Sequence, residues 1–222
     1  MRVALFDLDG TLLPGDSDHA FGEFVVRLGW ADGAEFARRN DRYYADYQQG
    51  RLDIADYIDF ITAPWRERPL PEAEAASRRF IDEVIRPMLR PQALALIEEH
   101  RRAGDRLAIV TATNDFVTRP IARLLGVADL IATELERDAH GRATGAIRGV
   151  PSFREGKVAR VEAWLGSLGA SLDRCDRSVF YSDSTNDLPL LERVSDPVAT
   201  NPAPALERLA RERGWPVLRL FE

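Results

Sequence analysis

Four aspartates lie in two short clusters of the sequence, and each cluster directly follows an apolar run. Asp7 and Asp9 form the first cluster, and Asp183 and Asp187 form the second. Two carboxylates one residue apart project to the same side of an extended chain. Carboxylates that are packed together repel one another unless a cation lies among them. Oxygen ligands of this kind suit Mg²⁺, so the four aspartates together predict a magnesium site.

Two further segments supply hydrogen-bond donors and positive charge. Thr111 and Ala112 begin a run of small residues between an apolar segment and a predicted helix. Backbone N–H groups at the start of a helix bind anions. Lys157 follows Gly156 at the start of another predicted helix and presents an ammonium group. A carboxylate nucleophile, a hydroxyl, a lysine and a Mg²⁺ site together indicate phosphoryl transfer through an aspartyl-phosphate.

The first cluster alone has an equally good structural interpretation, because Asp9-Gly10 is a common turn pair. The interpretation as a site depends on the elements that must bring the clusters together. Apolar runs predict strands, and amphipathic segments between them predict helices. The predicted strands cover residues 2–9, 106–111, 130–133, 178–182, 197–200 and 216–220. This alternation predicts an α/β fold with a Rossmann-like parallel sheet and helices on both faces, in which ligands bind at the carboxyl ends of the strands.

The segment after the first predicted strand differs from the rest of the chain in its hydrophobic pattern. Residues 15–89 contain four amphipathic helical patterns and no convincing strand, and residues 134–150 are expected to form a hairpin. We therefore predict two domains. Residues 1–14 and 90–222 form the catalytic core, and residues 15–89 form a helical cap inserted after the first strand.

Composition excludes several function classes. The 222 residues include 30 Lys and Arg against 36 Asp and Glu, a formal charge of −6, which argues against binding of nucleic acid through its phosphates. A single cysteine, Cys175, excludes an internal disulfide and a thiolate metal cluster. No apolar run is long enough for a signal peptide or a membrane span. We expect a cytoplasmic protein whose partner is a small molecule; the sequence does not indicate its oligomeric state.

The order of these motifs resembles the haloacid dehalogenase superfamily of phosphohydrolases. Asp-x-Asp-Gly-Thr begins at Asp7, a threonine ends a strand at Thr111, Lys157 follows, and Ser-Asp-x-x-x-Asp spans 182–187. Each motif is short, but the four in this order are specific. The helical insert resembles the cap of the phosphoserine-phosphatase-like branch. The opening FDLDGTLLPGDSDHAFGEF is similar to a bacterial subgroup that includes histidinol-phosphatase-like proteins.

The resemblance implies roles for the aspartates. Asp7 is the nucleophile, and Asp9 is the acid that protonates the leaving oxygen and the base that then activates water. An aspartate at position 9 favours a phosphatase or a mutase, because it lets the intermediate turn over. Mg²⁺ is bound by the Asp7 side chain, the Asp9 carbonyl and Asp183, and Asp187 reaches the metal through water or steadies Lys157.

The resemblance also implies which groups bind the substrate. Thr111, the Ala112 N–H and Lys157 contact the phosphoryl oxygens, and Asn186 is expected near the phosphate. In phosphoserine phosphatases a glutamate nine residues beyond the nucleophile contacts the substrate's amino group. Asp16 has that spacing here with a shorter side chain. The alternative is that Asp16 only caps the first helix of the insert.

These motifs predict a Mg²⁺-dependent phosphomonoester hydrolase for a small phosphorylated metabolite. Phosphorylated amino compounds such as L-histidinol phosphate or phosphoserine are the candidate substrates. Arg42, Tyr43 and Arg51, in or near a predicted cap helix, are further candidates for substrate contact. Two other functions fit the same motifs: a phosphotransferase or mutase, and a non-catalytic protein that binds a phosphorylated ligand. The second is disfavoured because the chain retains its lysine and its acids.

Overall fold

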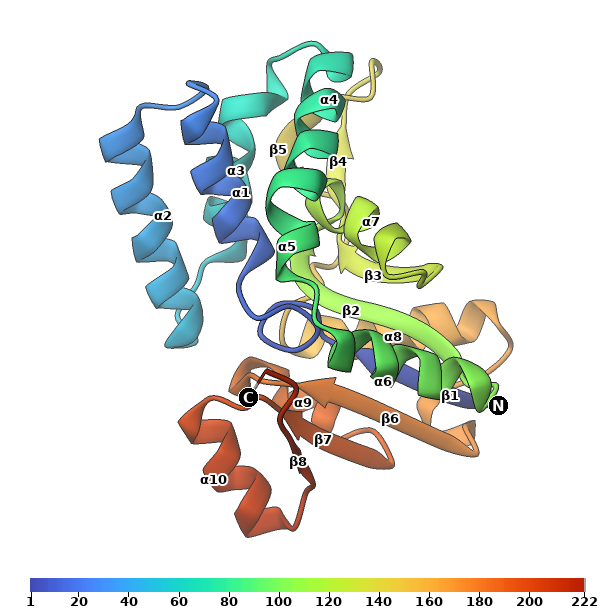
Figure 1. Cartoon of the computed structure of the whole chain (residues 1–222). Coiled ribbons are helices and arrows are strands. Elements are labelled where there is room, and N and C mark those ends of the chain that lie inside the picture. The colour runs from blue at the N-terminus through green and yellow to red at the C-terminus, as the bar shows by residue number, and fades with distance from the viewer. Residues whose placement is uncertain (222) are drawn as a thin grey trace.

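A six-stranded parallel sheet organises the chain, in a computed structural model that describes residues 1–221 (Figure 1). The strand order is β3-β2-β1-β6-β7-β8. All neighbouring strands pair in parallel, so their carboxyl ends share one edge of the sheet. The strands are β1 (Arg2–Phe6), β2 (Arg106–Asn114), β3 (Asp129–Thr133), β6 (Arg177–Ser182), β7 (Asp196–Thr200) and β8 (Val217–Leu218).

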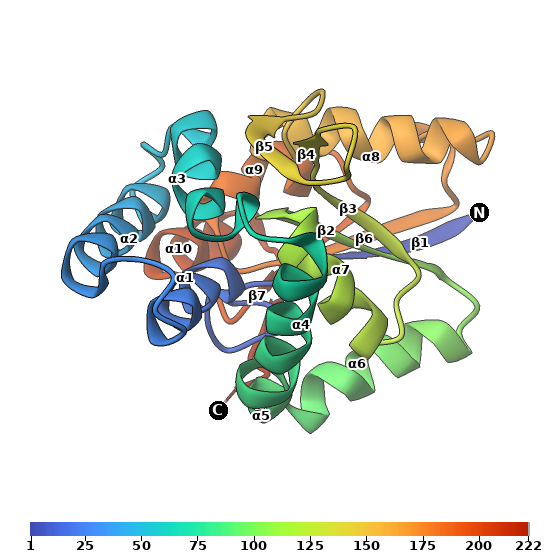
Figure 2. The ribbon, with the colours of Figure 1, turned by 90° about the horizontal axis from the view of Figure 1, so that it is seen from above.

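Helices cover both faces of the sheet, as predicted for the α/β, Rossmann-like fold. Along β1, Val3 and Leu5 point to one face, and Ala4 and Phe6 to the other, and all four are buried. The Phe6 face packs against α6 (Pro91–Arg102) and α7 (Asp115–Leu124). The opposite face packs against α8 (Glu155–Ser167), α9 (Leu188–Leu191) and α10 (Pro204–Arg213). Figure 2 shows α8 and α6 on opposite sides of the strands.

Four helices follow β1, as expected, and extend above the carboxyl edge of the sheet (Figure 1). They are α1 (Ser17–Arg27), α2 (Gly33–Gln48), α3 (Ile54–Arg66) and α4 (Leu70–Phe80). Asp16, Asp32 and Asp53 accept hydrogen bonds from the first turns of α1, α2 and α3, which fixes where those helices begin. An aromatic cluster that includes Phe21, Phe24 and Phe80 holds α1 against α4. Packing of this kind stabilises short helices more than propensity does.

The connection back to the sheet departs from regular α-helix. After α4 a π-helical turn, η1 (Ile81–Ile85), precedes α5 (Arg86–Met88), and the Arg86 N–H donates to the Ile81 carbonyl. Pro87 follows directly and has no N–H to donate, so a regular helical ladder is interrupted at this place. Two short 3₁₀ turns, η2 (Leu172–Arg174) and η3 (Thr185–Asp187), complete the helical elements.

A two-stranded antiparallel hairpin, β4 (Leu135–Arg137) and β5 (Ala143–Ile147), follows β3, as expected. Its β5 strand packs against α3, which the sequence did not predict. Gly145 has φ +94°, and a Cβ there would overlap the ion pair between Arg66 and Asp59 of α3. The glycine therefore allows the hairpin to lie directly on the helical segment.

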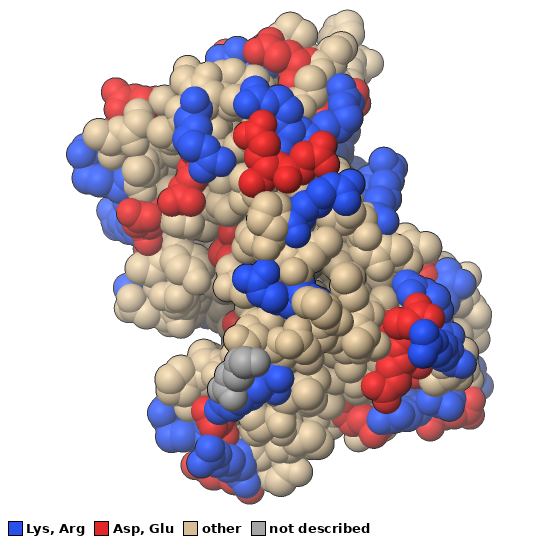
Figure 3. Space-filling model, viewed as in Figure 1, with Lys and Arg blue, Asp and Glu red and all other residues tan. Residues whose placement is uncertain are grey.

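The surface carries both signs of charge close together, as Figure 3 shows for the face in view. Many of these charges form ion pairs one helical turn apart, such as Arg79 with Glu83 and Arg86 with Asp82. Exposed pairs of this kind contribute about 0.3–0.5 kcal/mol each. No helix among residues 1–221 is long and apolar enough to cross a membrane.

Candidate active site

The loop after β1 carries the first two aspartates into contact with the second cluster. The Asp7 N–H donates to the Tyr181 carbonyl at 2.9 Å, which extends the pairing of β1 with β6 by one residue. Gly10 then reverses the chain with φ +73°, and a Cβ at this position would overlap the Asp183 carboxylate. Glycine is therefore required both for the turn and for the close approach of the two clusters.

Lys157 lies between two of the aspartates. Its Nζ is 2.9 Å from Asp7 Oδ1 and 2.7 Å from Asp187 Oδ1, and the lysine side chain is 1% exposed. Burial alone lowers the pKa of Lys157, but Asp187 and Asp7 more than offset this and hold it above its ordinary value. The Ser182 hydroxyl donates to Asp187 Oδ2 at 2.7 Å. Asp187 therefore holds the lysine ammonium beside Asp7.

The Asp7 carboxyl is buried, and burial raises its pKa to about 6, with the Asp187 charge acting in the same direction and Lys157 against it. Asp7 is thus mainly ionised at neutral pH. The Asp9 carboxyl differs. Burial, followed by the nearby Asp16 charge, raises the pKa of Asp9 to about 8, against the hydrogen bonds from Ser17. One carboxyl is therefore prepared as a nucleophile and the other carries a proton near neutral pH.

The Asp9 side chain is fixed from two directions. Its Oδ1 accepts the Ser17 N–H at 2.7 Å, from the first turn of α1. Its Oδ2 lies 2.9 Å from the Thr113 hydroxyl, near the end of β2. The predicted acid–base residue is thus held jointly by the core and by the helical segment.

The end of β2 differs from the expectation. The predicted strand stops at residue 111, but β2 continues to Asn114, with an irregularity in its pairing between Val110 and Asn114. Thr111 and Ala112 therefore lie on an extended strand end and not in a turn. Both line the same pocket as Asp7 and Asp9, so the predicted phosphate-binding groups and the predicted catalytic acids share one cavity.

The donor set at this edge fits Mg²⁺. Among residues 1–221 no three His, Cys, Asp or Glu side chains are grouped tightly enough to form a metal site alone. Mg²⁺ needs only one or two protein carboxylates, because waters and a substrate phosphate supply other ligands. Asp183 and Asp7 could provide two. Burial and then the Asp7 charge raise the pKa of Asp183 well above its usual range, which a bound cation would offset. Asp187, also predicted as a ligand, is engaged by Lys157 and Ser182.

Asn186 and a residue that the sequence did not predict, Arg154, connect the core to α2. Asn186 Nδ2 donates to the Tyr47 carbonyl at 2.9 Å, and the Arg154 guanidinium donates to the Gly50 carbonyl. Arg154 precedes α8 with φ 51° and ψ −122°, a conformation that is unfavourable for any residue except glycine. We refer to these two contacts as the α2 clasp.

The candidate site opens into a pocket between the core and the helical segment, which we call the acidic pocket. The core contributes Asp7, Asp9 and Thr111, among others. The helical segment contributes two further aspartates and four tyrosines: Asp16, Asp18, Tyr43, Tyr44, Tyr47 and Tyr57. A second groove shares Asp9 and Tyr47 with this pocket and is also lined by Asp183.

Of the other residues predicted to contact the substrate, the structure places only some at the acidic pocket. Asp16 lines the acidic pocket, but its Oδ1 also accepts the His19 N–H at 2.7 Å, which is the capping role stated as the alternative. Tyr43 lines the pocket as well. Arg51 instead pairs with Asp46 at 2.9 Å and does not line the pocket. Arg42 is 83% exposed and lies 3.9 Å from the same aspartate.

A family model of haloacid dehalogenase-like hydrolases matches residues 4–192, which is most of the chain. The chain belongs to the haloacid dehalogenase-like hydrolase family. It is 43% identical over 217 residues to a histidinol-phosphatase from Neisseria meningitidis serogroup C (strain 8013), with 98% of each chain covered. The predictions of this superfamily, and of an enzyme of the phosphatase type, are confirmed.

Two solved structures agree with the fold. A crystal structure of a Bordetella pertussis Tohama I protein with unknown function has a TM-score of 0.93, 49% sequence identity and 99% coverage of both chains. A substrate-bound phosphoserine phosphatase has a TM-score of 0.70 over 98% of this chain and 92% of its own. Its sequence identity is 18%, so this second likeness establishes the shared fold alone.

Proposed function

We propose that this hydrolase is a Mg²⁺-dependent phosphomonoesterase that acts through a phosphorylated Asp7. The observation that carries the proposal is the buried contact of Lys157 with Asp7, 2.9 Å apart, beside a pocket that both Asp7 and Asp9 line. A nucleophile, a proton donor and a cation for the phosphoryl oxygens are thereby close to one another. Residues 15–89 act as the cap of this site, and residues 1–14 and 90–222 act as its core.

The reaction has two steps. In the first, an Asp7 oxygen bonds to phosphorus, the bond from phosphorus to the leaving oxygen breaks, and Asp9 gives that oxygen its proton. In the second, the Asp9 carboxylate takes a proton from water as the water oxygen bonds to phosphorus. The bond between phosphorus and Asp7 then breaks, which releases inorganic phosphate and restores both carboxyls.

Donors from two segments, β2 and α8, surround the position of the phosphoryl group. The Lys157 ammonium, the Thr111 hydroxyl and the Ala112 N–H supply hydrogen bonds to its oxygens. Donors aimed at charge that develops in the transition state typically contribute about 3–4 kcal/mol each. Asp7, Asp183 and the Asp9 carbonyl would hold Mg²⁺, which phosphatases of this family generally use and which offsets repulsion between Asp7 and an anionic substrate.

The candidate substrate is a phosphorylated amino compound, with L-histidinol phosphate and phosphoserine as the compounds to test. The identity of 43% to a histidinol-phosphatase over nearly the whole of both chains supports the first of these.

Phosphate release from a panel of phosphorylated metabolites tests the proposal. The panel contains L-histidinol phosphate, phosphoserine, sugar phosphates and nucleotides, each with Mg²⁺. We expect one preferred substrate and a loss on the order of 10⁴-fold or more in Asp7→Asn, because the nucleophile is removed. The amide oxygen of that variant can still accept from Lys157, so its fold should be kept. Turnover that survives in Asp7→Asn would contradict the covalent mechanism. Transfer of the phosphoryl group to an added organic acceptor, without release of inorganic phosphate, would indicate a transferase.

A further inference from the structure

One carboxyl of the acidic pocket differs from the other three. Asp18, in the first turn of α1, is 2% exposed, and its Oδ2 has no hydrogen-bond partner of ordinary geometry, although the Tyr57 hydroxyl lies close enough to interact with this carboxyl. By contrast Asp7 contacts Lys157, Asp9 contacts Ser17 and Thr113, and Asp16 accepts a backbone N–H of α1. A buried oxygen without a partner costs about 1–3 kcal/mol, so a persistent one calls for an explanation.

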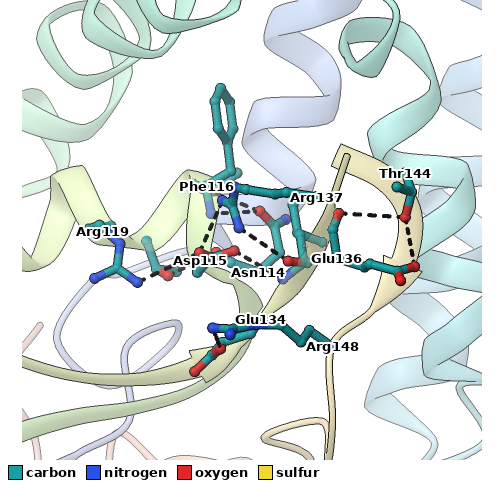
Figure 4. Close-up of polar contacts among 12 residues, drawn as sticks. Asn114, Asp115, Phe116, Arg119, Glu134, Glu136, Arg137, Thr144 and Arg148 are labelled. Atoms are coloured by element: carbon teal, nitrogen blue, oxygen red, sulfur yellow. Dashed lines mark hydrogen bonds and ion pairs between the residues drawn. The ribbon is translucent and has the colours of Figure 1, made fainter. Parts of the chain in front are cut away.

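The other Asp18 oxygen is held by the core. Asn114 Nδ2 donates to Asp18 Oδ1 at 2.9 Å. The orientation of this amide is determined, because Asn114 Oδ1 accepts the N–H groups of Phe116 and Val117 at the start of α7. The next residue, Asp115, holds the start of α7 against the hairpin, because it accepts the Leu135 N–H and pairs with Arg137 (Figure 4). Asp18 is therefore fixed beside the strand end that carries Thr111 and Ala112.

The charge of the pocket indicates what its ligand carries. Four aspartates line it, and none of the described residues that line it is Lys or Arg. His19 is also present, but its Nε2 lies 2.9 Å from Asp41. A leaving group with its own negative charge would find no Lys or Arg of the pocket to pair with. Burial, and then the Asp16 and Asp9 charges, raise the pKa of Asp18 well above its ordinary value, and a cationic group beside this carboxyl would favour its ionised form. The aromatic rings also attract cations through their faces.

Tyrosines complete this arrangement. Tyr57 lies beside Asp18, and burial and then the Asp18 charge raise the pKa of Tyr57 well above its ordinary value. Its hydroxyl therefore stays protonated. Tyr43, whose ring is 5.4 Å from that of Tyr57, lines the same pocket. Leu52 and Ile54 add apolar surface, which suits the carbon skeleton next to a charged group.

We propose that Asp18 is a specificity-determining residue that binds a primary ammonium group on the leaving-group part of the substrate, with Tyr43 and Tyr57 beside it. The inference rests on the proposed phosphomonoesterase function for the position of the phosphate. It transfers the ammonium contact from Asp16, the residue expected from the sequence, to Asp18. Because Asn114 directly follows the phosphate-binding strand end, the same element positions both parts of the ester.

Equilibrium binding to the Asp7→Asn protein tests this inference without requiring turnover. The probes are L-histidinol phosphate, O-phospho-L-serine and 2-aminoethyl phosphate, each compared with the same ester lacking its amino group. We expect at least one amino ester to bind about 10- to 100-fold more tightly than its deaminated partner. Adding Asp18→Asn should abolish that difference and leave the affinity for the deaminated ester within about twofold.

Two results would overturn the assignment. In the first, no amino ester binds more tightly than its deaminated partner. In the second, Asp18→Asn weakens both members of a pair equally, as a purely structural residue would. Asp16→Asn is the matched control, and a greater loss of amine discrimination there than in Asp18→Asn would return the contact to Asp16. Failure of the native protein with Mg²⁺ to hydrolyse any member of the phosphorylated panel would contradict the proposed function, while the binding comparison would still decide the role of Asp18.

Discussion

The core side and the helical side of the acidic pocket are built on opposite principles. On the core side, Lys157 bridges Asp7 and Asp187, and hydroxyl groups from Thr113 and Ser182 fix the neighbouring carboxyls. On the helical side, Asp18 keeps an oxygen without a partner among tyrosines from two helices. In the proposed mechanism, the reacting groups are held before the substrate arrives, whereas the group proposed to select the substrate leaves part of its bonding capacity for it.

The largest expected loss of activity and stability comes from replacing Lys157 on the core side of the pocket. Lys157→Met removes the cation and leaves the Asp7 and Asp187 carboxylates facing each other in a buried site. Loss of one partner of a buried ion pair costs about 3–5 kcal/mol of unfolding free energy. We expect no measurable phosphatase activity and a much lower midpoint in chemical denaturation.

The double variant Lys157→Met with Asp187→Asn separates the two consequences. It removes one of the opposed charges, so it should recover part of the stability without recovering activity. Recovery of turnover in the double variant would show that Lys157 acts through stability and not on the phosphoryl group.

An intermediate effect is expected from pH in protein treated with EDTA. The folded-state pKa values of Asp7 and Asp9 are raised to about 6 and about 8, above an unfolded value of about 3.9. The folded protein therefore binds more protons than the unfolded chain over this range. Stability falls as pH rises above about 4, and the fall due to Asp7 is complete by about pH 6 and that due to Asp9 by about pH 8.

Thermal unfolding between pH 5 and 9 measures this slope, at about 2–4 °C per kcal/mol for a chain of this length. Added Mg²⁺ should raise the midpoint more at pH 8 than at pH 6, because it binds ionised carboxylates. Asp9→Asn should reduce the slope between about pH 6 and pH 8. A midpoint that rises with pH in EDTA would contradict the assignment of raised pKa values.

The smallest effect is expected at the α2 clasp, which joins the two sides. Arg154→Ala and Arg154→Gly both remove the contact with the Gly50 carbonyl, so each should raise KM by about two- to fivefold through a less firmly held α2. The two differ in backbone strain, because only glycine adopts φ 51° without cost. We expect the glycine variant to be more stable than the alanine variant by about 1 kcal/mol in urea unfolding. Equal stabilities would show that no strain is stored at this position.

The core could be predicted from the sequence because its chemistry lies in short segments at the ends of parallel strands. The order of the motifs predicts Lys157 near Asp7 and Asp187, and the structure brings both carboxylates within hydrogen-bond distance of the lysine. The extension of β2 to Asn114 is not predicted, because Thr-Ala-Thr-Asn is equally typical of a turn before a helix.

For the helical side, the sequence predicts the helices but not which of their side chains face the pocket. Asp16, Ser17 and Asp18 all resemble capping residues, since acids are common in the first turn of any helix. Which of them caps α1 and which faces the pocket depends on the rotation of α1 against α2 and α3, and tertiary packing sets that rotation. The role of Arg154 could not be predicted either. Its unusual backbone conformation depends on how α8 packs in the folded protein, and the residue type does not indicate it.

The contact between β5 and α3 limits how this chain can be recombined with its relatives. The helical segment is attached to the rest of the protein by its two connections, and the hairpin of Leu135–Ile147 also rests on it. A chimera that replaces residues 15–89 alone would place a foreign α3 against the native hairpin. In the native protein Gly145 of this hairpin packs against the Arg66 and Asp59 side chains, and a Cβ at this position would overlap them. The unit to exchange is therefore discontinuous: the four helices together with a hairpin that lies on the far side of β2 and β3 in the chain.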